Sequence, residues 1–90
     1  MKKQANDLFK LLSDDSKLRI VKFLLENEGG SCSDLSSFIN KDLSTTFRHI
    51  ENLRKNKLVT TKKQGRYLLC SIKNKEALRN LLSMSKEIGD

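Results

Sequence analysis

The spacing of apolar residues changes at about residue 58 of this 90-residue chain, and the change limits the folds open to it. Before that point, apolar side chains recur at helical intervals in four segments: 4–12, 15–27, 34–39 and 43–56. After it, two β-prone segments, 58–61 and 66–72, flank a turn at 62–65 in which Gly65 can adopt positive φ. The sequence therefore predicts a mainly helical fold that carries one β-hairpin.

Short polar residues and glycines mark where the helices begin and end. The predicted caps and stops are Ser13 or Asp14, Gly29–Gly30, Ser33, Asp42, and Asn74 before a last helix to about Ile88. A tight turn at Asn40–Lys41 joins a short helix to a longer one, as in a helix-turn-helix, and the hairpin after it would be a wing. We expect one domain over residues 1–90, a winged helix-turn-helix with the order α-α-(β)-α-α-β-β-α, whose connector before the third helix adds a short strand.

Composition excludes several classes of protein. No apolar run approaches the roughly 18 residues of a membrane span, and the N-terminus lacks the apolar stretch of a signal peptide, so we expect a cytoplasmic protein. Two cysteines do not make a disulfide framework. The sequence has no glycine-rich phosphate loop and no cysteine–histidine or paired-carboxylate arrangement that can be placed in a pocket. We therefore expect neither an enzyme nor a bound cofactor.

Positive charge is concentrated in one segment. Residues 41–66 hold eight Lys or Arg against two acidic residues, or +6, whereas the rest of the chain adds only +1 to the net charge of +7. A solvated surface that is basic by chance would spread such an excess. The concentration indicates a polyanionic partner, most often nucleic acid.

The helix at about 43–56 has two different faces. An apolar stripe of Leu43, Thr46, Phe47, Ile50 and Leu53 is predicted to pack on the preceding helices. The opposite face carries Ser44, Arg48, Asn52 and Lys55, flanked by Lys41 and Thr45. As the recognition helix of this fold it would enter the major groove with its N-terminal part, so we expect Ser44, Thr45 and Arg48 to read bases and Asn52 and Lys55 to contact phosphates. The alternative is an ordinary solvated face.

Two residues of this helix allow a second interpretation. Phe47 lies at the edge of the apolar stripe, and we expect it in the core rather than against a thymine methyl group. His49, the only histidine, is expected to be partly buried and hydrogen-bonded rather than a ligand or a catalytic group.

The predicted hairpin tip, Lys62-Lys63-Gln64-Gly65-Arg66, places three cations on a narrow turn that cannot bury them. Contacts to the DNA backbone or the minor groove explain Lys62, Lys63, Gln64 and Arg66 better than a solubilising loop does.

Three segments resemble the ArsR/SmtB family of winged-helix repressors, in the same order and spacing. Residues 12–20, LSDDSKLRI, are similar to the family's LadptRlrI; residues 47–59, FRHIENLRKNKLV, to SrHLklLreaGLV; and residues 65–72, GRYLLCSI, to GrwvyYsL. The resemblance covers roughly residues 5–72. It implies a homodimeric transcriptional repressor that binds an inverted repeat in double-stranded DNA, with the first and last helices as the dimer interface. The apolar residues on those helices are Leu8, Phe9, Leu12, Leu78, Leu81, Leu82 and Ile88.

The chain departs from the family at its metal sites. Where metal-sensing members have two cysteines at the start of the third helix, this sequence has Ser31 and Ser33, and Cys32 takes the apolar position between them. The last helix has no histidine, so we expect no metal sensing. A short strand before the third helix would bring Cys32 near Cys70, which makes them a candidate redox pair, although a free buried cysteine is the commoner role.

A winged helix can also serve as a protein-interaction module in a transcription or chromatin assembly, with its basic segment on an acidic partner. This remains the alternative to DNA binding.

Overall fold

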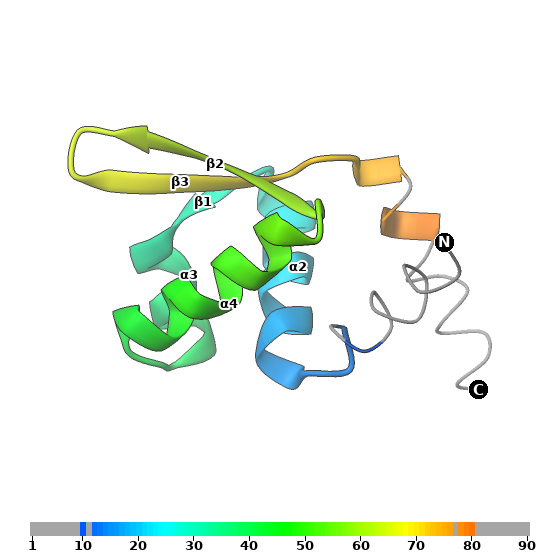
Figure 1. Ribbon diagram of the computed structural model, residues 1–90, viewed down its shortest axis with the longest axis horizontal. Coiled ribbons are helices and arrows are strands. Elements are labelled where there is room, and N and C mark those ends of the chain that lie inside the picture. The colour runs from blue at the N-terminus through cyan, green and yellow to red at the C-terminus, as the bar shows by residue number, and fades with distance from the viewer. Residues whose placement is uncertain (1–9, 11, 77, 81–90) are drawn as a thin grey trace.

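The computed structural model describes residues 10, 12–76 and 78–80. Its elements are α2 (Asp15–Asn27), β1 (Gly30–Ser31), α3 (Cys32–Ile39), α4 (Leu43–Lys55), β2 (Val59–Gln64) and β3 (Tyr67–Ile72) (Figure 1). The three strands form one antiparallel sheet in the order β1-β3-β2. This arrangement confirms the predicted winged helix-turn-helix fold, including the short strand before the third helix.

Helix α2 begins and ends by local hydrogen bonding. The Asp14 side chain accepts a hydrogen bond from the Lys17 amide at 3.1 Å, so the predicted N-cap is confirmed. The chain leaves the helix through Glu28, at φ 56°, and not through a glycine. Gly29 is needed for a different reason: its φ is 120°, and a Cβ there would lie 3.1 Å from the Cys70 carbonyl oxygen.

The cap of α3 differs from the prediction. Ser31, not Ser33, accepts a hydrogen bond from the Asp34 amide at 3.1 Å, while the Asp34 carboxylate accepts one from the Ser31 amide at 3.2 Å. This is a capping box, with serine and acid three residues apart. The helix ends at Asn40, which takes the left-handed conformation (φ 58°) and so opens the tight turn into α4.

The core lies between the three helices and the inner face of the sheet. Its completely or almost completely buried side chains are Ile20, Val21, Leu24, Leu35, Ile39, Thr46, Ile50, Leu53, Val59 and Cys70. Leu12 and Leu78 also belong to this cluster, at 8% and 3% exposure. Both were predicted to face a partner subunit, and in the structure they are covered largely by their own chain.

The predicted apolar stripe of α4 was only partly correct. Thr46, Ile50 and Leu53 are buried, and the Thr46 hydroxyl donates a hydrogen bond to the Asp42 carbonyl at 2.9 Å. Leu43 and Phe47, however, are 55% and 47% exposed, so the prediction that Phe47 lies in the core was wrong. Both lie on the flank of α4 that turns toward the hairpin, where the neighbouring elements leave them half uncovered.

The hairpin is longer than predicted. The first strand continues through Lys62, Lys63 and Gln64, and the two-residue turn is Gly65–Arg66, closed by the pair Gln64 and Tyr67. Gly65 has φ 62°, as a tight hairpin turn requires at its first central position. Figure 1 shows the hairpin running out beyond α3 and α4, so its far half forms a wing.

Candidate nucleic-acid interface

The ten residues predicted to contact DNA are almost all on the surface. Nine are exposed: Lys41, Ser44, Arg48, Asn52, Lys55, Lys62, Lys63, Gln64 and Arg66. Thr45 is half-buried, and its hydroxyl lies beside the Asp42 carboxylate, which lowers the pKa of Asp42. These residues come from two elements, α4 with the turn before it and the hairpin.

Helix α4, the hairpin and the start of α3 border one open hollow of about 570 Å³. Ser44, Phe47 and Glu51 line it from α4, and Lys63, Arg66 and Tyr67 line it from the hairpin. The hollow therefore brings the exposed side of the recognition helix next to the wing tip, two parts of the chain that are far apart in sequence. Sequence reasoning missed this shared hollow because it depends on how the wing lies against α4.

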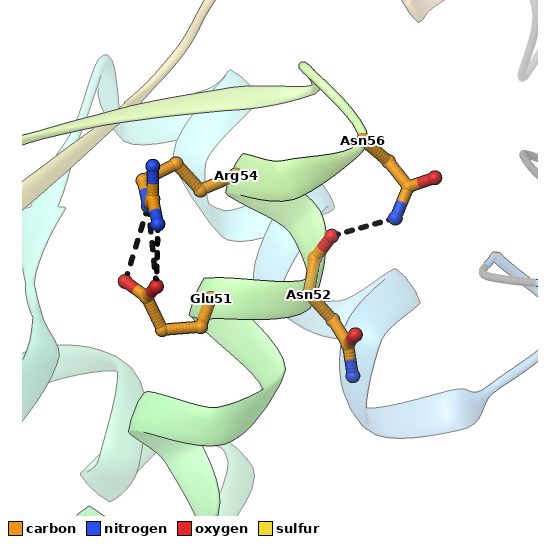
Figure 2. A network of polar contacts seen from close by, with 4 residues as sticks. All are labelled: Glu51, Asn52, Arg54 and Asn56. Carbon is orange, nitrogen blue, oxygen red and sulfur yellow. Dashed lines mark hydrogen bonds and ion pairs between the residues drawn. The ribbon is translucent and has the colours of Figure 1, made fainter.

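Arg54, one of the eight basic residues in the charged segment, is engaged by an acid on its own helix. Its guanidinium donates to the Glu51 carboxylate, with Nη2 to Oε1 at 2.7 Å (Figure 2). The hydrogen bond and the opposite charge lower the pKa of Glu51 and raise that of Arg54. An acid and a base three residues apart on a helix face each other, so this pair could have been read from the sequence.

The side chains at the end of α4 leave Asn52 pointing outward. The side-chain amide of Asn56 donates a hydrogen bond to the backbone carbonyl of Asn52 at 2.8 Å. The Asn52 side chain itself points away from the Glu51–Arg54 pair (Figure 2). Asn52 is therefore exposed and directed to solvent, as a phosphate contact requires.

His49 is half-buried on α4, as predicted. Burial, with Lys17 next in effect, lowers its pKa below the ordinary value of 6.5. The imidazole is therefore neutral at physiological pH and adds no positive charge to the face of α4.

The two cysteines lie near each other as free thiols. Gly30 pairs with Cys70 across β1 and β3, and Cys32 follows two residues later at the start of α3. Burial, with a contribution from the Cys32 thiol, raises the pKa of Cys70 to about 12, and burial also raises the pKa of Cys32. Because the thiolate is the reactive form, the raised pKa values disfavour reaction of both thiols at neutral pH.

The predictions about metal sites, membrane spans and the dimer interface can be compared with the structure only over the described residues. Within residues 10, 12–76 and 78–80, no three His, Cys, Asp or Glu side chains come together as a metal site. No helix in the same part of the chain is long and apolar enough to cross a membrane. Of the predicted dimer residues, Leu8, Phe9, Leu81, Leu82 and Ile88 lie outside the described residues.

The sequence matches known proteins over most of its length. Residues 13–60 match the family model described as winged helix-turn-helix DNA-binding. The chain is 33% identical over 80 residues to the cadmium resistance transcriptional regulatory protein CadC of Listeria innocua serovar 6a. That match covers 89% of this chain but only 66% of the relative, so the chain spans slightly less than two thirds of that protein.

Solved structures of similar proteins have the same winged helix-turn-helix fold. The crystal structure of an ArsR family transcriptional regulator is 26% identical, with a TM-score of 0.74 over 98% of this chain and 92% of that one. A homodimeric winged helix-turn-helix domain of Mycobacterium bovis is 16% identical and shares the fold, with a TM-score of 0.82 over 97% of this chain and 80% of that one. The chain belongs to the winged helix-turn-helix DNA-binding family and is an ArsR-like member of it.

Proposed function

We propose that residues 1–90 act as one domain that binds double-stranded DNA in a sequence-specific manner, as a homodimeric repressor in the cytoplasm. The observation that carries the proposal is the hollow shared by α4 and the wing, because Ser44 of the recognition helix and the wing cations Lys63 and Arg66 border the same space. No catalytic role is assigned to the chain.

In this mode the N-terminal half of α4 enters the major groove. Ser44, Thr45 and Arg48 read base edges, with the Arg48 fork suited to the O6 and N7 atoms of guanine. Phosphates on either side meet the polar and basic residues around this centre: Lys41, Asn52, Lys55, Lys62, Lys63, Gln64 and Arg66.

A two-fold dimer sets the symmetry of the DNA site. Two recognition helices about 34 Å apart read two half-sites one helical turn apart, so the site is an inverted repeat. The homodimeric Mycobacterium bovis domain of the same fold supports a dimer. The interface would use the first and last helices, where Leu8, Phe9, Leu81, Leu82 and Ile88 are the predicted contacts beyond the buried Leu12 and Leu78.

Selection of bound duplexes from random DNA tests this function. We expect an inverted repeat with half-sites centred about 10 base pairs apart, recovered with and without reductant because burial raises the pKa of the Cys70 thiol and so disfavours its reactive thiolate. Failure to bind any duplex at low salt would refute DNA binding and leave the protein-interaction module. Selection that succeeds only in reductant, with loss of both free thiols by mass, would instead establish Cys32 and Cys70 as a redox pair.

We also propose that this chain does not sense cadmium, although its relative is a cadmium resistance regulator. Ser31 is engaged in the capping box of α3, and a serine hydroxyl is a poor ligand for soft ions, which bind thiolates. We expect the affinity for the selected duplex to stay within about twofold when Cd²⁺ is added at a tenfold excess over protein. Release of the DNA by Cd²⁺, reversed by a chelator, would contradict this prediction. A variant with Ser31→Cys and Ser33→Cys tests whether the missing thiolate pair is the reason, because it should release the DNA when Cd²⁺ is added.

A further inference from the structure

The DNA-facing side of the molecule carries large apolar side chains as well as charges. Leu43 is 55% exposed, Phe47 is 47% exposed and Tyr67 is 54% exposed, and all three line the hollow between α4 and the wing. The buried side of α4 is already complete with Thr46, Ile50 and Leu53, so these residues are not needed to close the core. Their exposure on an otherwise polar and basic surface calls for an apolar partner.

The geometry of α4 places this apolar surface beside the polar one. Leu43 and Phe47 are four residues apart and therefore lie one above the other on the flank that faces the wing. Ser44 and Arg48 each follow one residue later and lie further out from the core. The helix thus presents two parallel rows, a polar row of Ser44 and Arg48 and an apolar row of Leu43 and Phe47.

Charge decides what can enter beside the apolar row. Lys63 and Arg66 lie at the wing side of the hollow and attract phosphate oxygens there. Glu51 lines the α4 side, one turn beyond Phe47, and its carboxylate is already paired with Arg54, so α4 offers no unpaired cation to a phosphate in the hollow. An apolar, uncharged group therefore matches the surface at Phe47 best, while its neighbours along the strand are anionic. In the major groove, the C5-methyl group of thymine meets this description.

We propose that Phe47, supported by Leu43, contacts the C5-methyl group of a thymine in each half-site and so determines sequence specificity beside Arg48. This inference rests on the proposed function, since it names the base that the same interface recognises. It also assigns a role to the aromatic ring that stands where the similar family motif has a small serine.

Deoxyuridine tests the contact because it lacks only the methyl group. In the selected inverted repeat, each thymine is replaced in turn by deoxyuridine. We expect one replacement to weaken binding about fourfold per half-site, the loss for one buried methyl group. The Phe47→Ser variant should bind the thymine and deoxyuridine duplexes equally. Leu43→Ser should reduce the difference without removing it.

Phe38→Ser is the matched control. Phe38 is 44% exposed, close to the exposure of Phe47, but it lies on α3 against Phe23 and Arg19 and does not line the hollow. This variant should keep the full thymine preference. Thermal unfolding of each variant checks that the fold is intact.

The outcomes separate this inference from the proposed function. If the protein selects a specific duplex but no deoxyuridine replacement matters, the thymine contact is refuted and DNA binding stands. The contact is likewise refuted if Phe47→Ser keeps the deoxyuridine effect, or if it weakens selected and random duplexes equally. If no duplex is bound at low salt, both proposals fail together.

Discussion

The affinity of the dimer for its DNA site is expected to fall about a thousandfold between 50 and 200 mM monovalent salt. Each phosphate neutralised by a cation releases condensed counterions, so the logarithm of the affinity falls with the logarithm of salt concentration by about 0.9 per contact. Five exposed cations per protomer are among the proposed phosphate contacts: Lys41, Lys55, Lys62, Lys63 and Arg66. Roughly six contacts in the dimer are enough for the thousandfold loss.

Lys63→Ala assigns part of this slope to the wing. It removes one cation from each protomer, so the slope should fall by about 1.8, and selected and random duplexes should weaken by a similar factor. Lys22→Ala removes the same charge from an exposed position on α2 that does not line the hollow, and it should leave the slope unchanged. Fluorescence anisotropy titrations at four or five salt concentrations measure both slopes. Binding that is insensitive to salt would exclude the basic segment as a phosphate-contacting surface.

The order of elements could be predicted from the sequence because it depends on local rules. The bounds of α2 follow from helical spacing and the Asp14 cap, and they were predicted correctly. The cap of α3 also follows a local rule, since Ser31 and Asp34 have the spacing of a capping box, although the predicted cap is Ser33. A serine caps a helix when its hydroxyl reaches the backbone amide three residues later. Lying next to the predicted first residue of the helix is not enough.

The positions of Leu43 and Phe47 could not be predicted in the same way. A helical projection gives the angle of a side chain around α4, but it does not say how far the neighbouring elements extend to cover it. Phe47 and Ile50 are close in projection, yet one is 47% exposed and the other is buried. The difference arises because the wing stands off from α4 and leaves a hollow of about 570 Å³. Tertiary packing of the wing therefore decides where apolar surface of α4 is left exposed.

The length of the wing shows a related limit. The sequence predicts a turn at Lys62, Lys63 and Gln64 because Gly65, which follows them, can adopt positive φ. In the structure each pairs with a residue of β3, namely Leu69, Leu68 and Tyr67. A strand that projects from the core needs no burial on both faces, so polar residues continue it wherever the cross-strand register and the Gly65 turn permit.

Arg48→Ala is expected to reduce the preference for the selected duplex over random DNA by about 30-fold or more. A bidentate arginine–guanine contact contributes about 1–3 kcal/mol of discrimination, and a dimer makes the contact twice. Arg48 is exposed on the outer side of α4, next to the apolar row, and in the proposed binding mode this side faces the base edges of the major groove. The quantity to measure is the ratio of the two affinities at one salt concentration, because loss of charge weakens both duplexes and cancels.

Arg48→Lys separates base recognition from charge. Lysine keeps the positive charge but cannot form the planar two-bond fork of arginine, so this variant should retain affinity for random DNA and lose much of the preference. If Arg48→Lys keeps the full ratio, Arg48 contacts a phosphate and recognition must rest on Ser44, Thr45 and Phe47. If the Arg48 variants lose the preference and Phe47→Ser also loses its thymine sensitivity, guanine and thymine are read by adjacent rows of one helix. A duplex in which both the guanine and the thymine of one half-site are replaced would then show whether the two contacts act independently. Independent contacts give free-energy losses that add.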